Sequence, residues 1–170
     1  MVIPALLMLV AGVGCQTPTN YTYDKTADFS HYKTFVVGDP MGSRELFVYG
    51  DKAAIDQQLK QAITAKLISA GLEVVAEDAQ PQLTILSQWW ATRDTEQNQI
   101  VGPVGTPQGD PKMVTRGSLE IAVVDNTTGK SIYRSWSPWP VKADRLAGAE
   151  INNLVEWTLS AYPPKSDAGR

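Results

Sequence analysis

The pattern of hydrophobic and polar residues predicts two amphipathic helices. Between residues 51 and 70, apolar side chains recur every three or four positions, and lysine and glutamine occupy the opposite side; this apolar stripe is Ile55, Leu59, Ala62, Ile63, Leu67 and Ala70. Asp51 is suited to begin this helix and Gly71 to end it. A second stripe of the same kind is Ala147, Ile151, Leu154, Val155, Thr158 and Tyr162, and Pro163 and Pro164 would end that helix.

Segments rich in aromatic and β-branched residues, or of alternating polarity, predict the strands of a sheet. These segments are residues 21–24, 33–37, 72–75, 83–92, 113–124 and 131–141. The segment 83–92 carries apolar side chains on both of its faces, so we expect this strand in the centre of the sheet. Asp125 and Asn126 suit the start of a turn, and Gly129 can supply a positive φ, so the last two strands are expected to form a hairpin.

The order of these elements predicts an α+β fold in a single domain. Strands joined by turns, with two one-faced helices to cover them, give a two-layer sandwich: a mainly antiparallel sheet of about five or six strands with both helices packed on one face. Hydrophobic residues make up 43% of the 170 residues and charged residues 19%, which is a globular and not a disordered composition. We place the domain at residues 21–164 and a tail at 165–170. Residues 93–112, polar and rich in Gly and Pro, are expected to form a long mobile loop.

An apolar run at the start of the chain ends at its only cysteine, Cys15. Residues 2–13 carry no charge, but the run is shorter than the about 20 residues that a membrane-spanning helix needs, and its length suits a secretory signal peptide. The small residues before the cysteine resemble the lipobox of bacterial lipoproteins, in which the cysteine is diacylated and the preceding peptide is removed. The alternatives are ordinary signal cleavage nearby and a buried free thiol.

The lipobox resemblance implies a membrane anchor. Residues 1–14 would be removed as the signal peptide, and residues 15–20 would form the lipidated cysteine and a short polar tether. Two or more acyl chains hold a protein firmly on a bilayer, whereas one chain binds only reversibly. Gln16 follows the cysteine where the inner-membrane retention signal of enteric lipoproteins has aspartate. The resemblance therefore implies the outer membrane, on its periplasmic side.

Several segments of the chain resemble a family of bacterial lipoproteins that share the domain of unknown function numbered 4136. The matching segments are YDKTADFSHYKTF, AGL at the end of the first helix, PQLTILSQ, GSLEIAVVDNTTGKSIYRSW and AYPP. In one place the chain departs from the family, because Tyr133 precedes Arg134 where the family often has tryptophan. These segments are structural signatures. The resemblance therefore implies a location in the envelope and supplies no catalytic residue.

Composition narrows the possible chemistry. A formal net charge of -3 provides no basic stripe for phosphates, so nucleic acid is not an expected partner. His31 is the only histidine, which leaves no imidazole pair for a metal. We therefore expect no metal or cofactor, and we expect His31 to be a solvent-facing turn residue.

The sequence TGKS at 128–131 resembles the end of a phosphate-binding loop, but Val124 stands where that loop requires glycine. A pair of carboxylates, as in glycoside hydrolysis, stays open.

Tryptophan supplies the candidate binding residues. Trp89 and Trp90 are neighbours on a predicted strand, so their side chains point to opposite faces and cannot share one core. Trp136 and Trp139 also differ by an odd number of positions. Exposed aromatic rings suit contact with glycans, peptides or a lipid interface. We take Trp89, Trp90, Trp136 and Trp139 as a candidate binding surface, the alternative being that the long loop or the second helix covers them.

Three functions are therefore considered. The first is a non-enzymatic envelope lipoprotein, tethered by Cys15, whose domain binds or braces another envelope component such as a protein or a glycan. The second is a carrier of a lipid or small ligand, with a pocket between sheet and helices beneath the loop at 93–112. The third is a carboxylate-dependent hydrolase.

Overall fold

The structure is a computed structural model that describes residues 20–40, 52–96, 100–101, 107–108, 112–141 and 148–164. For residues 91–116 and 139–141 within these ranges, only the backbone is described. The predicted signal peptide, Cys15, Asp51, Ala147 and the tail at 165–170 lie outside the described residues.

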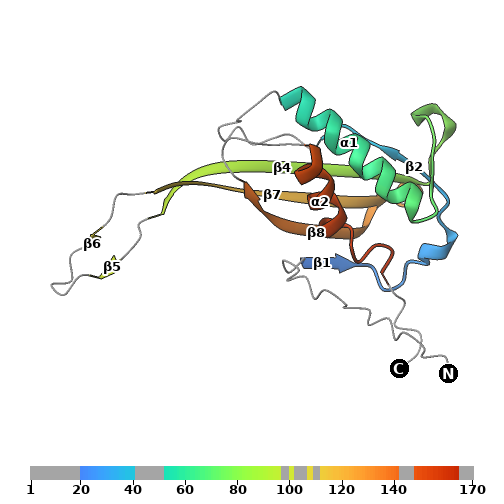
Figure 1. The fold of residues 1–170 in the computed structure, drawn as a ribbon. Coiled ribbons are helices and arrows are strands. Elements are labelled where there is room, and N and C mark those ends of the chain that lie inside the picture. Colours follow the sequence, from blue (N-terminus) through green and yellow to red (C-terminus); the bar gives the residue numbers. More distant parts are fainter. Residues whose placement is uncertain are drawn as a thin grey trace, which may run out of the picture.

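Six strands form one mixed sheet in the order β1-β8-β7-β4-β2-β3 (Figure 1). Their bounds are β1 Asn20–Tyr23, β2 Thr34–Val37, β3 Glu73–Val74, β4 Leu83–Glu96, β7 Lys112–Asp125 and β8 Lys130–Val141. β1, β8, β7 and β4 run antiparallel, whereas β2 is parallel to both β3 and β4. The predicted fold class is confirmed, and β4 is a central strand as expected.

Two helices cover one face of this sheet, α1 (Lys52–Ser69) and α2 (Gly148–Thr158), and they lie side by side (Figure 1). Neither is both long enough and apolar enough to cross a bilayer. Gly71 ends α1 as predicted, with φ of 92°. The amide of Leu72 donates to the carbonyl of Leu67 at 3.1 Å, and that of Gly71 donates to Ile68 at 2.9 Å, which is the Schellman arrangement. This termination directs Leu72 onto the core.

The core lies between the two helices and the sheet face that carries the odd-numbered residues of β4, β7 and β8. Its fully buried side chains include Phe35, Ile63, Leu67, Leu83, Ile85, Leu119, Ile121, Val123, Ile151 and Leu159. Among the described residues of the two predicted helical stripes, all but Ala70 are buried, although Tyr162 lies beyond the end of α2 and not on the helix. Ala70 is exposed because α1 ends one residue before it.

The turn between β7 and β8 has the conformation that its sequence predicts. Gly129 has φ of 67°, and the Asp125 carboxylate accepts hydrogen bonds from the amide of Thr127 at 2.8 Å and the hydroxyl of Thr128 at 2.9 Å. The Asn126 side-chain amide donates to the carbonyl of Pro81 at 2.7 Å, which joins this turn to the start of β4. The TGKS sequence therefore belongs to a turn between two strands and not to a phosphate-binding loop.

The segment expected as a loop between residues 93 and 112 is partly regular. β4 continues to Glu96 and pairs with β7 as far as Lys112, and β5 (Ile100–Val101) and β6 (Pro107–Gln108) form a separate two-stranded sheet. The expectation of a loop is therefore wrong for residues 93–96, 100–101, 107–108 and 112. Polar side chains give no alternating pattern there, but the backbone groups of two facing strands can pair whatever the side chains are.

Candidate functional site

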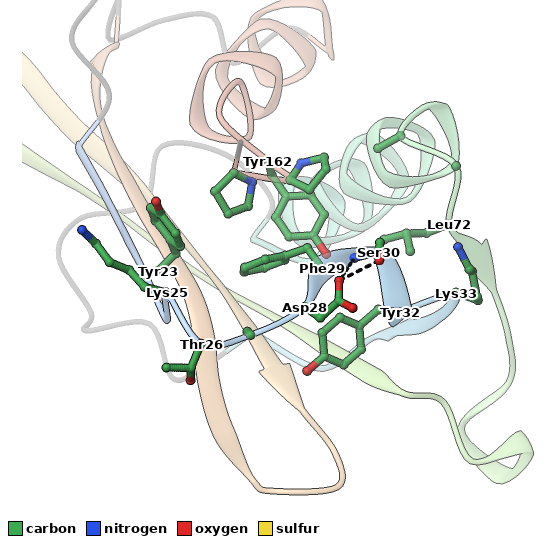
Figure 2. A pocket seen from close by; sticks show the side chains of 15 residues that line it. Tyr23, Lys25, Thr26, Asp28, Phe29, Ser30, Tyr32, Lys33, Leu72 and Tyr162 are labelled. Carbon is green, nitrogen blue, oxygen red and sulfur yellow. Dashed lines mark hydrogen bonds between the residues drawn. The ribbon is translucent and has the colours of Figure 1, made fainter. Parts of the chain in front are cut away.

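A cleft of about 800 Å³ lies at the end of the sheet where β4 begins. Three segments line it: residues from the stretch 23–33, which runs from the end of β1 to the start of β2, residues 70–72 after α1, and residues 162–164 after α2 (Figure 2). Of the segment expected as a loop at 93–112, the described residues 93–96 form the opposite end of β4 (Figure 1). The described cleft is therefore not the pocket that we expected beneath that loop.

Aromatic rings form the walls of this cleft. Phe29, in the short 3-10 helix η1 (Phe29–His31), lies at the centre of the group. Its ring meets those of Tyr23, Tyr32 and Tyr162 edge to face, with centroids 6.3, 6.4 and 6.0 Å away. Tyr162 in turn meets the buried ring of Tyr133 at 5.1 Å. Such pairs each contribute about 0.5–1.5 kcal/mol beyond their buried area, so the walls are an extension of the core.

Two aspartates hold the backbone that carries Phe29. The Asp24 carboxylate accepts from the amide of Thr26 at 2.8 Å and from its hydroxyl at 2.6 Å. The Asp28 carboxylate accepts from the amide of Ser30 at 3.0 Å and from its hydroxyl at 2.6 Å, which caps the start of η1 (Figure 2). These local bonds fix the turn, and the position of the Phe29 ring follows from it.

The polar groups of the lining are mainly cationic and neutral. Lys25 and Lys33 line the cleft, and Asp28 is the one acidic side chain among the described lining residues. Hydrogen bonds from Ser30 lower the pKa of Asp28, so this carboxylate is ionised at neutral pH. Burial raises the pKa of Tyr162, and burial followed by the nearby Asp125 carboxylate raises that of Tyr32. Both phenols are therefore neutral at physiological pH.

The described lining does not contain the pair of carboxyl groups that glycoside hydrolysis uses. Glycoside hydrolysis needs two carboxyl groups, one of them with a raised pKa, whereas the described lining has one, and its pKa is lowered. His31 is exposed and is not among the lining residues. Within the described residues, no three His, Cys, Asp or Glu side chains gather into a possible metal site.

The structure separates the candidate tryptophans. Trp89 lies in the core, 3% exposed, and its indole donates to the Asp56 carboxylate at 2.7 Å. Trp90 and Trp136 lie on the other face of the sheet, away from the helices; Trp90 is half-buried and Trp136 is exposed. The backbone of Trp139 pairs with Gly117, and its side chain lies outside the described part of the chain. Trp89 therefore belongs to no exposed binding surface.

The cleft residues were not predicted from the sequence as a site. Three of the segments that carry the family resemblance, YDKTADFSHYKTF, AGL and AYPP, surround the cleft. In the sequence they read as ends of structural elements. One feature of the sequence could have indicated a site here. YDKTADFSHYKTF and AYPP, which lie far apart in the chain, both combine aromatic residues with turn or proline residues.

Acid is expected to destabilise the fold through these turn carboxylates. Hydrogen bonds lower the pKa values of Asp24, Asp28 and Asp125 below the ordinary 3.8. Their stabilisation is therefore fully present above about pH 3.8 and is lost as the pH falls through the lower values of the folded state. Urea unfolding between pH 6 and pH 2.5 should show this loss, and an Asp24→Asn/Asp28→Asn double variant should show less of it. A wild-type unfolding free energy that stays constant across this range would contradict the assignment.

Several solved structures share the fold. A PDZ domain protein from Parabacteroides distasonis matches with a TM-score of 0.60 and 14% identity over 87% of this chain, but this chain spans only 36% of that protein. A PelC dodecamer from Paraburkholderia phytofirmans matches with a TM-score of 0.52 and 12% identity, over 84% of this chain and 94% of the other. A DUF4136 family protein from Bacteroides thetaiotaomicron matches with a TM-score of 0.51 and 14% identity, over 88% and 97%.

These low identities show a common fold and nothing more. Comparison with proteins of curated function gives no match. The family model described as "Domain of unknown function (DUF4136)" matches residues 19–164, which is most of the chain and includes every residue that the structure describes. The chain therefore belongs to the DUF4136 family.

Proposed function

We propose that the chain is a lipid-anchored protein of the bacterial envelope, held by Cys15 at the periplasmic side of the outer membrane, whose domain binds another envelope component without catalysis. The anchor is supported by the apolar run, the small residues before Cys15 and the polar residues after it. The family match begins at residue 19, near the end of the proposed tether at 15–20. The binding site is the aromatic cleft around Phe29 and Tyr162.

One observation carries the binding proposal. Three segments from distant parts of the chain, each at the end of a strand or helix, meet to form one cleft with aromatic walls. Its volume of about 800 Å³ lies in the range of roughly 300–1,000 Å³ typical of ligand sites. Aromatic walls present flat apolar faces and edges, and Lys25 and Lys33 add positive charge. Such a lining suits a sugar ring or an apolar side chain next to an acidic or neutral polar group.

A carrier of a lipid or small ligand is the second candidate. The volume of the cleft favours it, because a site of this size can enclose a large part of a small molecule. A carboxylate-dependent hydrolase has no comparable support among the residues that line the cleft. The carrier and the binder of an envelope component can be distinguished by purification. A carrier should retain a small bound molecule when the protein is extracted from the membrane, whereas a binder of a larger envelope component need not.

Occupancy of the cleft can be measured by native mass spectrometry of protein purified from its own membrane. Phe29→Leu keeps an apolar side chain but removes the ring that meets three other rings, so we expect bound ligand to fall about tenfold relative to wild type. Trp157→Leu, which removes an exposed ring from α2 outside the cleft, should retain wild-type occupancy.

Thermal unfolding of each variant controls for loss of the fold. Equal occupancy in wild type and in a folded Phe29→Leu protein would contradict the cleft as the site. A wild-type protein that carries no bound small molecule would argue against the carrier and leave the envelope partner as the ligand.

A further inference from the structure

The first strand of the domain begins very close to the proposed anchor. β1 starts at Asn20, and only residues 16–19 separate Asn20 from Cys15. Five residue steps of fully extended chain span at most about 18 Å. Wherever an acylated Cys15 lies on a bilayer, the start of β1 must lie within that distance of it.

Two exposed aromatic side chains flank this start. Asn20 pairs with Trp136 of β8, and Tyr21 pairs with Ser135. Ser135 is buried on the helix side of the sheet, so Tyr21 projects to that side and Trp136 to the other. Tyr21 is 47% exposed and Trp136 is 36% exposed. The edge of the sheet therefore carries one exposed amphipathic ring on each of its faces, at the end where the tether arrives.

The other exposed large apolar side chains of the described residues lie on other elements. Ile68 is on α1, Val74 on β3 and Trp157 on α2. β3 is the opposite edge of the six-stranded sheet, and at about 4.8 Å between strands the two edges are about 24 Å apart. The pair formed by Tyr21 and Trp136 thus lies at the edge of the sheet that the tether joins, whereas Val74 lies at the opposite edge.

Tyr and Trp rings favour the boundary between lipid and water, where the ring meets apolar chains and the polar atom meets headgroups. Arg134, two residues before Trp136 on the same face, has a side chain that is 57% exposed. Its charge suits anionic headgroups, although it also pairs with Glu120 at 3.3 Å. Both features match the chemistry of a lipid surface.

We propose that the β1 edge, defined as Asn20, Tyr21 and Trp136, lies on the bilayer that holds the anchor, with Tyr21 and Trp136 in its headgroup layer. This inference rests on the proposed lipid anchor at Cys15. We assign the lipid surface as the partner of this edge because the tether ends here. The short tether keeps the edge within reach of the bilayer, so no other molecule is needed to bring the two together. The β3 edge then points away from the membrane.

Site-directed spin labels on the full-length lipidated protein test this orientation. An acylated Cys15 leaves no thiol in the chain, so a single introduced cysteine is labelled alone. Thr22→Cys places the label on β1, and the matched control Ala79→Cys places it at an exposed position of the 3-10 helix η2 (Glu77–Ala79), beyond the β3 strand. The protein is reconstituted in phosphatidylethanolamine and phosphatidylglycerol vesicles that contain a nickel-chelating lipid.

We expect collisional relaxation by the nickel lipid to be at least about fivefold greater at position 22 than at position 79. Trp136→Ser should reduce the value at position 22, and Trp157→Ser should leave it unchanged. Mass spectrometry of the same samples reports the acyl groups.

Equal relaxation at the two positions in an acylated protein would overturn the orientation and leave the anchor intact. Spin–spin coupling between labels at position 22 of different copies would assign the edge to a second copy and also overturn it. A protein without acyl groups would overturn the anchor and the orientation together.

Discussion

Replacement of Cys15 by serine is expected to move the protein from the membrane fraction to the soluble periplasmic fraction. Serine cannot accept the thioether-linked diacylglyceryl group, so two or more acyl chains are lost. One chain alone gives only reversible binding, with a membrane association constant on the order of 10⁴ M⁻¹, so a protein that has lost all its chains should no longer be recovered with the membrane. Fractionation and labelling with a radioactive fatty acid measure the two effects.

A Gln16→Asp variant is the matched control, because it changes the residue next to the cysteine and leaves the thiol in place. By resemblance to the sorting rule of enteric lipoproteins, it should keep its acyl label and move to the inner membrane. A Cys15→Ser protein that stays in the membrane fraction with unchanged processing would show that the lipobox interpretation is wrong.

Replacement of Phe35 by alanine is expected to remove much of the stability of the domain. Phe35 is 0% exposed on β2 and belongs to the core between sheet and helices. Truncation of a buried phenylalanine to alanine costs about 3–5 kcal/mol, against a total stability of about 5–15 kcal/mol for a typical domain. Urea unfolding followed by circular dichroism should therefore show a much lower midpoint or no folded baseline.

Val74→Ala provides the control for this change. Val74 is the direct partner of Phe35 in the pairing of β2 with β3, but it lies 44% exposed at the edge of the sheet. Its truncation removes little buried surface, so we expect a loss below about 1 kcal/mol. Similar losses for the two variants would contradict the placement of the core.

Local features of the fold could be predicted because each depends on residues close in sequence. The apolar stripes place α1 and α2, and Gly71 and Gly129 have the positive φ values that their positions indicated. The parallel pairing of β2 with β3 and β4 is different. It depends on α1 crossing the sheet between β2 and β3, and no short stretch of sequence records such a crossing.

The tryptophan pair marks the limit of this kind of prediction. Period-two alternation requires Trp89 and Trp90 to face opposite sides, and they do. Which of the two is buried depends on the side of β4 that the helices cover. Asp56 on α1 accepts the hydrogen bond of the Trp89 indole, and this contact between distant residues could not be predicted from the alternation.

The cleft could not be predicted for a related reason. Phe29 and Tyr162 follow the ends of separate elements, and their ring centroids lie 6.0 Å apart only because β1, α1 and α2 end at the same side of the domain.

β1 also links the proposed anchor to the proposed binding cleft. Its first residue, Asn20, follows the tether and its last, Tyr23, lines the cleft, so an anchored domain would hold a bound molecule near the membrane.

Photo-crosslinking in intact cells tests the central claim, that an anchored domain binds an envelope component in the aromatic cleft. A benzoyl-phenylalanine introduced at Phe29 places the reactive group inside the cleft, and the same residue at Trp157 places it on exposed α2 outside the cleft. We expect a discrete adduct with an envelope component from position 29 and none from position 157. No adduct from position 29, or the same adduct from both positions, would contradict it.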